Sequence, residues 1–203
     1  MCSNIVYTLV KKYKEGILFI DMVVYFDKPG NYTDEVLKIV KERVEKGGIN
    51  QIIIATTSGA SALKAMNYFS NVKLVAVTHQ AGFQAPGEME IPLETIEKLQ
   101  ENNVIVVTAT HALAGIDRAI RKKHGTWMIA ELIAETFRVF GQGTKVCAEI
   151  VAMAADAGVI TMDDVIAVSG TGRGADTAWV IKPAHTQNFF DMKIKELLCK
   201  PAN

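Results

Sequence analysis

Short apolar runs alternate along this chain with segments whose apolar residues recur at helical spacing. The runs are rich in β-branched residues and end at small or polar residues, which is typical of buried strands. Between the first two runs, apolar residues repeat every three or four positions from Val36 to Val44, after a predicted Thr33 N-cap and before Gly47 and Gly48. The pattern predicts six strands, at residues 23–26, 52–55, 74–77, 104–107, 165–168 and 178–181.

Four further segments have helical spacing. They run from 59 to 69, from Pro92 to about Asn102, from 126 to 140 and from 144 to 157, and no strand is predicted between 117 and 158. Alternation of strands and helices predicts an α/β fold with a mostly parallel sheet covered on both faces. The last two strands are joined by residues 169–177, too few for a helical crossover, so we expect an antiparallel pair at a sheet edge.

Composition narrows the classes of partner. The chain has 203 residues and nearly half are apolar, which favours a single domain. Lys plus Arg equals Asp plus Glu, at 22 each, so no basic excess favours nucleic acid or an anionic membrane. The three cysteines, Cys2, Cys147 and Cys199, form no CxxC pair, which fits a reducing compartment. We expect a cytoplasmic protein that binds neither nucleic acid nor membrane.

The first 21 residues are apolar only in patches. Lys11, Lys12, Lys14 and Glu15 interrupt them well short of the roughly 20 apolar residues that a membrane span needs. We treat residues 1–21 as an N-terminal extension, with Met22 as an alternative start, and residues 22–203 as one domain.

Loops rich in small and polar residues follow four of the predicted strands. Ligands of open α/β sheets lie beyond the carboxyl ends of the parallel strands, so loops 56–61, 78–88, 108–115 and 169–176 are expected to converge on one crevice. The first loop enters a helix, where free N–H groups and the helix dipole favour a phosphate. Its candidate phosphate ligands are Thr56, Thr57, Ser58, Gly59 and Ser61.

The other three loops carry candidate contacts for the rest of a ligand. His79 and His111 each follow a strand and could bind a ligand or move a proton, although a half-buried structural role is nearly as well supported. Residues 80–90 suggest a flap over the crevice. The hydroxyls of Ser169 and Thr171 and the charge of Arg173 could reach phosphate, whereas turn formation alone would equally explain this loop.

Several common sites are not indicated. The chain has no GxxxxGK[ST] motif, no GxGxxG that opens a helix after a strand, and no HxH or HExxH motif, so we predict neither a P-loop nor a metal site. Ser58 has no evident His and Asp support, so no nucleophile or other catalytic residue is identified. Asp176 is expected to order the last loop rather than act as a base.

Read together, these segments resemble the C-terminal α/β domain of pyruvate kinase. The resemblance is closer still to stand-alone pyruvate-kinase C-terminal-domain-like proteins of microbes and covers about residues 22–201. The matching stretches in this chain are IIIATTSGASA (52–62), KLVAVT (73–78), KVCAEIVAMAADAGVI (145–160) and DDVIAVSGTG (163–172), together with YFDKPG (25–30), HQAGF (79–83), THALAG (110–115), GADTAWVIKPAH (174–185) and NFFD (188–191).

The resemblance implies a three-layer α/β/α sandwich that binds a phosphorylated small molecule, with flavin mononucleotide (FMN) as the favoured cofactor. Because the catalytic barrel of pyruvate kinase has no counterpart, pyruvate kinase activity is not expected. The alternatives are an FMN-dependent oxidoreductase and a sugar-phosphate-sensing regulatory module without flavin. The predicted binding residues are Thr56, Thr57, Ser58, Gly59, Ser61, His79, Gly82, Phe83, His111, Ala112, Leu113, Ser169, Gly170, Thr171, Gly172, Arg173 and Asp176.

Two further expectations concern single positions. Gly59→Asp is expected to abolish phosphate binding while the fold survives, because a carboxylate would replace the anion. Phe189, Phe190 and Leu197 are candidates for a contact in a homo-oligomer, although ordinary core packing is slightly favoured.

Overall fold

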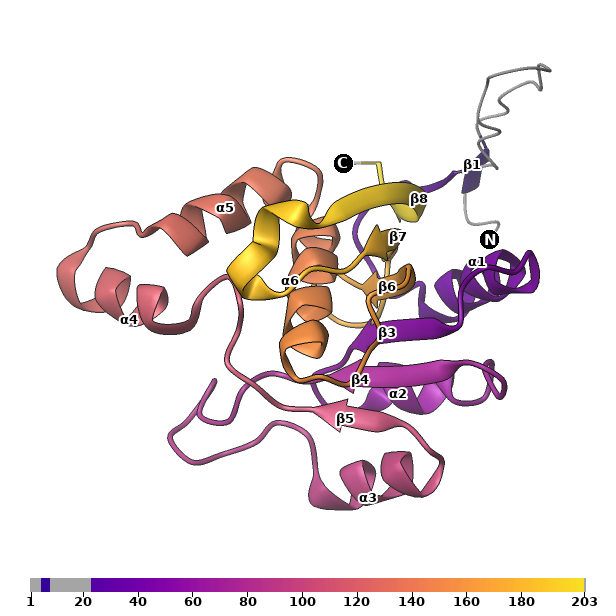
Figure 1. The fold of residues 1–203 in the computed structure, drawn as a ribbon, viewed down its shortest axis with the longest axis horizontal. Helices are drawn as coiled ribbons and strands as arrows, with labels where there is room; N and C mark the ends of the chain where they lie inside the picture. The colour runs from indigo at the N-terminus through magenta and orange to yellow at the C-terminus, as the bar shows by residue number, and fades with distance from the viewer. Residues whose placement is uncertain (1–4, 8–22, 203) are drawn as a thin grey trace.

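The computed structural model describes residues 5–7 and 23–202, which form an eight-stranded mixed sheet with helices on both faces (Figure 1). All six predicted strands are present, and two more complete the sheet. The strands are β1 (Ile5–Tyr7), β2 (Val24–Phe26), β3 (Gln51–Ala55), β4 (Lys73–Val77), β5 (Ile105–Val107), β6 (Val165–Ser169), β7 (Thr177–Lys182) and β8 (Lys193–Pro201).

The strand order across the sheet is β1-β2-β8-β7-β6-β3-β4-β5. Strands β6, β3, β4 and β5 are neighbours and run parallel, as do β2 and β8. The edge strands are β1 and β5, and β1 pairs antiparallel with β2. The expected α/β class, with a mostly parallel sheet and an antiparallel edge strand, is confirmed.

The position of β7 differs from the expectation. Its antiparallel pairing with β6 is as predicted, but β7 lies inside the sheet because β8 pairs with its other side. The sequence KIKELLCKP of β8 does not alternate cleanly between polar and apolar residues. Irregular register between β7 and β8, after Ala178 and again after Val180, interrupts the alternation that would reveal this strand.

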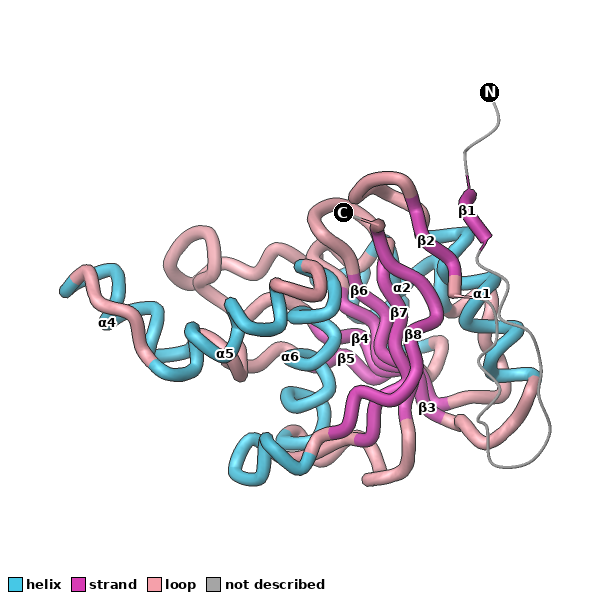
Figure 2. The backbone as a smooth tube through the Cα atoms, turned by 90° about the horizontal axis from the view of Figure 1, so that it is seen from above, coloured by secondary structure: helices cyan, strands magenta, loops and turns pink. Residues whose placement is uncertain are grey.

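Helices lie on the two faces of the sheet and in an arm that extends beyond it (Figures 1 and 2). One face is covered by α1, α2 and α3, and the other by α6, which gives the three expected layers. The helices are α1 (Thr33–Glu45), α2 (Ala60–Ala65), α3 (Leu93–Glu101), α4 (Gly115–His124), α5 (Ile129–Arg138), α6 (Gln142–Asp156) and the 3-10 helix η1 (Thr186–Asp191).

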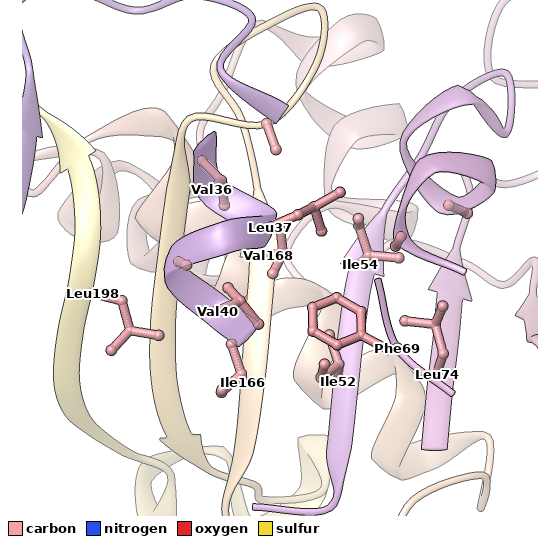
Figure 3. Packing of buried hydrophobic residues seen from close by; sticks show 14 of the residues in the cluster. Val36, Leu37, Val40, Ile52, Ile54, Phe69, Leu74, Ile166, Val168 and Leu198 are labelled. Carbon is pink, nitrogen blue, oxygen red and sulfur yellow. The ribbon is translucent and has the colours of Figure 1, made fainter. Parts of the chain in front are cut away.

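Strand β3 illustrates how the sheet divides the core. Successive side chains of a strand point to opposite faces, so Ile52 and Ile54 pack on the α1 and α2 side, whereas Ile53 packs beneath α6. Figure 3 shows the first side, where Val36 and Val40 of α1 lie against the sheet. All five side chains are fully buried.

Two helix boundaries differ from the predicted ones, and one helix was not predicted. Thr33 is the first residue of α1 rather than its cap, and its hydroxyl donates to Asn31 Oδ1 at 2.7 Å. α2 ends at Ala65 rather than near Phe69. Beyond Ala65 the chain continues in turns, in which the amides of Asn67 and Tyr68 donate to carbonyls three residues earlier. α4 was not predicted as a separate helix; it is described in full and buries none of its residues, so it lacks an apolar stripe turned to the core.

The predicted extension, residues 1–21, lies outside the described residues apart from β1, and its boundary at Met22 stays a prediction. Within residues 5–7 and 23–202, no helix combines the length and the apolar character needed to cross a membrane.

Candidate functional site

Four loops leave the same edge of the sheet. Because β6, β3, β4 and β5 are adjacent and parallel, the loops after them all start at their carboxyl ends. Hydrogen bonds join the loop starts: Thr56 N donates to Val77 O, and Thr78 N donates to Val107 O, both at 2.9 Å. The hydroxyls of Thr78 and Thr108 are 2.7 Å apart. The structure therefore brings the four predicted loops to one edge.

The first loop contains a buried hydroxyl without a partner. Thr56 directly follows β3 and is buried, and among the described residues its Oγ1 is the one buried side-chain nitrogen or oxygen that makes no hydrogen bond within the chain. Buried polar groups normally have partners, since desolvating one without a partner costs about 1–3 kcal/mol. Thr57 and Ser58 are exposed beside it, and Ser61 is half-buried in α2. This arrangement offers hydroxyl groups to a bound ligand.

Gly59 has a structural role that the sequence did not indicate. Its φ is +90°, and a Cβ at this position would lie 2.3 Å from Thr95 Cγ2 of α3. An L side chain would therefore be strained by the backbone and would also overlap α3. Gly59→Asp is therefore expected to destabilise the fold as well as to repel a phosphate, because this glycine allows α2 to begin against α3.

The second and third loops bring three aromatic rings together. The ring centroids of His79 and Phe83 are 4.1 Å apart, those of Phe83 and His111 are 5.1 Å apart, and those of the two histidines are 5.4 Å apart. The guanidinium of Arg118 lies 5.2 Å from the Phe83 ring centroid. His79 Nδ1 is 2.6 Å from Glu90 Oε2, so this carboxylate orients the first histidine. We call His79, Phe83 and His111 the ring cluster.

Burial changes the proton affinity of one member of the ring cluster. Loss of hydration lowers the pKa of His111 from its ordinary 6.5 to about 4. The carboxylate of Glu149 acts in the opposite direction, whereas the charges of His79, Lys145 and Arg118 lower the pKa further. His111 is therefore neutral near pH 7, with one ring nitrogen able to donate and the other able to accept a hydrogen bond.

The predicted flap, residues 80–90, is a loop that folds back on itself. Gly82 N donates to Glu88 O at 2.8 Å, and both Gly82 and Gly87 have positive φ, at +75° and +78°. The side chain of Gln80 accepts a hydrogen bond from His111 N at 3.3 Å. Phe83 is thereby held over the two histidines, at the point where the flap meets the third loop.

The fourth loop presents a surface whose shape is set by buried groups. Ser169 donates its hydroxyl to Gly143 O at 2.7 Å, and Asp176 Oδ2 accepts from Thr171 N at 3.1 Å, so both side chains are used inside the protein. As expected, Asp176 orders this loop. Gly170 approaches Gly174 O so closely that a Cβ would lie 2.1 Å from it. The exposed members of the loop are Thr171, Gly172 and Arg173.

A buried ion pair behind the third loop was missed by the sequence reasoning. Lys145 and Glu149 are both buried on α6 and pair with each other, and Glu149 Oε1 accepts from Leu113 N at 3.0 Å. The side chain of Leu113 is buried, and its backbone amide is held in place by Glu149. Ala112 beside it is half-buried. In the sequence, two opposite charges four residues apart within a mostly apolar helix were the pattern that could have indicated this ion pair. Arg118 and Glu90 were also missed, and no spacing pattern pointed to them.

A polar hollow of about 590 Å³ lies at the opposite edge of the sheet. It is lined by the start of β3 and β4 and by the segment before β6, and it contains Lys73, Lys182, Lys195, Asp163 and Asp164. Lys195 pairs with Asp164 at 2.7 Å, and Lys182 donates to a backbone carbonyl. None of the predicted binding residues lines this hollow. Among residues 5–7 and 23–202, no group of three or more His, Cys, Asp and Glu side chains is placed to hold a metal ion.

Comparison with known proteins gives one family. Residues 34–181 match the sequence profile of the pyruvate kinase alpha/beta domain. Among solved structures, the chain is similar to Cryptosporidium parvum pyruvate kinase in complex with ADP, at 16% identity and a TM-score of 0.39, over 84% of this chain and 24% of that one. Another structure of a pyruvate kinase from Cryptosporidium parvum matches at 15% identity and a TM-score of 0.40, over 77% of this chain and 24% of that one. The chain thus spans about a quarter of the length of these solved proteins.

Proposed function

Because the chain belongs to the pyruvate kinase alpha/beta domain family, we propose that the carboxyl edge of β6, β3, β4 and β5 binds a phosphorylated small molecule, with FMN as the favoured ligand. The observation that carries this proposal is the buried Thr56 hydroxyl, which has no partner within the described chain and follows the central strand of that edge. A phosphate oxygen is an acceptor that this hydroxyl can bond.

The residues of the four loops fit the two ends of a flavin nucleotide. The hydroxyls of Thr57, Ser58 and Ser61 would hold the phosphate beside Thr56, and Arg173 would add positive charge from the fourth loop. The ring cluster would cover the flat ring system, since aromatic rings stack well on one another. When bound, FMN supplies hydride or electron transfer, and the protein supplies binding and orientation.

Two alternatives have support of their own. An FMN-dependent oxidoreductase is supported by the imidazoles of His79 and His111, whose ring centroids are 5.4 Å apart, because an imidazole beside the flavin ring could assist proton transfer. A sugar-phosphate-sensing module without flavin is supported by the family match, because it needs only the hydroxyl-rich first loop and the fourth loop. The three functions share the phosphate subsite and differ in the need for the ring cluster.

Absorbance of the purified protein separates these functions. We expect the flavin bands of FMN, or their appearance as a shifted spectrum when FMN is added to colourless protein. Riboflavin, which lacks the phosphate, serves as the matched control and should bind at least about tenfold more weakly. A protein that binds a sugar phosphate but neither flavin supports the sensing module, and reduction of bound FMN by a nicotinamide donor supports the oxidoreductase. Absence of binding by all of these compounds contradicts the proposal.

A charge placed in the first loop tests the phosphate subsite. Ser58→Asp sets a carboxylate on an exposed position beside Thr56 and is expected to weaken FMN binding by at least about tenfold, because two anions repel. Ser70→Asp is the matched control, since Ser70 is also exposed but precedes β4 at the opposite edge of the sheet. Equal affinity of the two variants in calorimetry would show that the anion does not lie in this loop.

A further inference from the structure

In the arm formed by α4 and α5, residues 115–140, polar side chains join the two helices and several large apolar side chains are exposed. Asp117 Oδ2 accepts from Ala130 N at 3.0 Å and thereby ties α4 to the first turn of α5. Arg121 Nε bonds both carboxylate oxygens of Glu131 at 2.8 and 2.9 Å, and Glu131 is buried. Charged groups therefore hold the two helices together, where a helical hairpin normally packs apolar residues.

The outward face of α5 is an apolar stripe. Ile129, Leu132, Thr136 and Val139 are separated by three, four and three positions, which places them on one face of the helix. Ile129 is 74% exposed, Leu132 52% and Val139 81%. Thr136 donates its hydroxyl to Leu132 O at 3.1 Å, so it adds no unpaired polar group to the stripe. We call these four residues the α5 stripe.

The inner face of α5 is supported within the described chain, where Ala134 is buried and the ring centroids of Phe137 and Phe189 are 6.0 Å apart, whereas the outer side of the arm is not covered. It extends away from the sheet (Figures 1 and 2), and α4, all of whose residues are described, buries none of them. Isolated helices shorter than about 12 residues are marginal in water. Six of the ten exposed large apolar side chains in the described residues lie in the arm: Ile116, Trp127, Ile129, Leu132, Val139 and Phe140.

The apolar area of the arm is sufficient for a dimer interface. Six large side chains that each expose about 100 Å² present about 600 Å², the upper end of the largest apolar patch on a typical monomer. Three of these side chains, Ile129, Leu132 and Val139, form the α5 stripe, so a contact centred on the stripe reaches about 1,200 Å², the lower end of the range for specific interfaces, when the other three side chains take part as well.

We propose that the α5 stripe packs against the same stripe of a second copy of this chain, in a two-fold symmetric dimer. The spacing of the stripe is the same in both directions, so an antiparallel pair of α5 helices sets Ile129 of one copy against Val139 of the other, and Leu132 against Thr136. Closed two-fold association is the commonest symmetry among oligomers. A neighbouring groove of about 310 Å³, lined by Phe137 and Phe189 among other side chains, gives room for the partner's apolar residues.

The oligomeric state of the full chain tests this dimer. The mass from light scattering or sedimentation is expected to be twice 22.2 kDa and to fall toward 22.2 kDa on dilution. In the double variant Leu132→Glu/Val139→Glu, the dimer dissociation constant is expected to rise at least about a hundredfold, because each charge enters the interface twice. Both positions are exposed in one copy, so the variant should keep its circular dichroism spectrum and unfold cooperatively.

Leu93→Glu is the matched control, since Leu93 is also exposed on a helix but lies on α3, away from the arm. It should leave the dimer intact. A wild-type chain that is monomeric at every soluble concentration overturns the proposal and means that a different partner, or solvent, covers the stripe. A double variant that dimerises as tightly as wild type, or a control that dissociates equally, also overturns it. The outcome does not depend on which ligand occupies the carboxyl edge.

Discussion

Two buried threonines differ in whether their hydroxyls have partners. Thr33 donates to Asn31 Oδ1 and accepts from Ala175 N at 3.0 Å, whereas Thr56 has no partner within the described chain. Thr33→Val should destabilise the protein by about 1–3 kcal/mol, because it leaves a buried N–H unpaired. Thr56→Val should leave the free energy of unfolding unchanged or raise it by about 1 kcal/mol, because it removes an unpaired polar group.

The same pair of variants separates folding from binding. In FMN titration, Thr56→Val is expected to lose about tenfold in affinity, about 1.4 kcal/mol, through loss of one hydrogen bond to the phosphate. Thr33→Val should bind normally once folded. Denaturant unfolding gives the first comparison and calorimetry the second. A Thr56→Val variant that is destabilised as much as Thr33→Val would mean that the Thr56 hydroxyl serves the fold instead of a ligand.

The buried imidazole of His111 makes stability depend on pH. Its pKa is about 4 in the folded protein against an ordinary 6.5, so between these values the unfolded chain binds more protons and stability falls as the pH is lowered. From pH 7 to pH 4, wild type should lose about 3 kcal/mol more than His111→Phe, which keeps an aromatic ring and cannot titrate. Urea unfolding of both proteins across this range measures the difference, and parallel curves would contradict the pKa assignment.

At the scale of residues, the sequence predicted groups whose role follows from local position. Hydroxyl and glycine residues after a strand indicated the first and fourth loops. The three members of the ring cluster were each predicted as binding residues. Glu90 and Arg118 were missed because their partners, His79 and Phe83, lie on other segments and only the tertiary structure brings them together. Ser169 was predicted to face a ligand, whereas its hydroxyl is used by Gly143 O within the fold.

The contact between α2 and α3 depends on the absence of one side chain. Gly59→Ala combines a positive φ with a Cβ placed 2.3 Å from Thr95 Cγ2 and should cost about 2–4 kcal/mol in unfolding free energy. Gly47→Ala is the matched control: its φ is also positive, at +83°, but no described atom beyond its chain neighbours lies within 4 Å of its Cβ. Backbone strain alone should cost this variant about 1 kcal/mol.

A second substitution distinguishes the two contributions at Gly59. Thr95→Ser removes the methyl group that the new Cβ would meet, so the double variant Gly59→Ala/Thr95→Ser should recover most of the cost in excess of Gly47→Ala. Chemical denaturation of the four proteins gives the required differences. If Gly59→Ala is no worse than Gly47→Ala, α2 can shift away from α3 at little cost.

At the scale of elements, burial determined what the sequence could predict. Each of the six predicted strands carries an apolar run that includes buried residues, and α1, α3 and α6 show apolar faces or flanking glycines. α4 buries nothing, so its indications were a basic last turn and Gly125 at its C-terminus, with φ at +70°. β8 was missed because its irregular pairing with β7 disturbs the two-residue period that reveals a strand.

At the scale of the whole molecule, pairing between distant segments completes the sheet. β8, near the C-terminus, lies between β7 and β2, so Cys199 pairs with both Ala178 and Val24. Strand order of this kind depends on packing between segments far apart in sequence, and local patterns carry no record of it. What sequence order did indicate is that strands joined by helical crossovers run parallel, and this placed the ends of β3, β4 and β5 at one edge.

This arrangement predicts how a ligand should change the dynamics of the whole chain. If FMN binds at the carboxyl edge, amide hydrogen exchange should slow together in residues 56–61, 78–88, 108–115 and 169–176, because the loops share one crevice and hydrogen bonds link the starts of three of them. Residues 46–50 and 161–164, at the opposite hollow, serve as the internal control and should be unchanged. Inorganic phosphate should protect the first and fourth loops without the other two, since it lacks the flat ring that the ring cluster would cover. Protection at the opposite hollow alone would place the ligand among Lys73, Lys182 and Lys195 and contradict the proposed site.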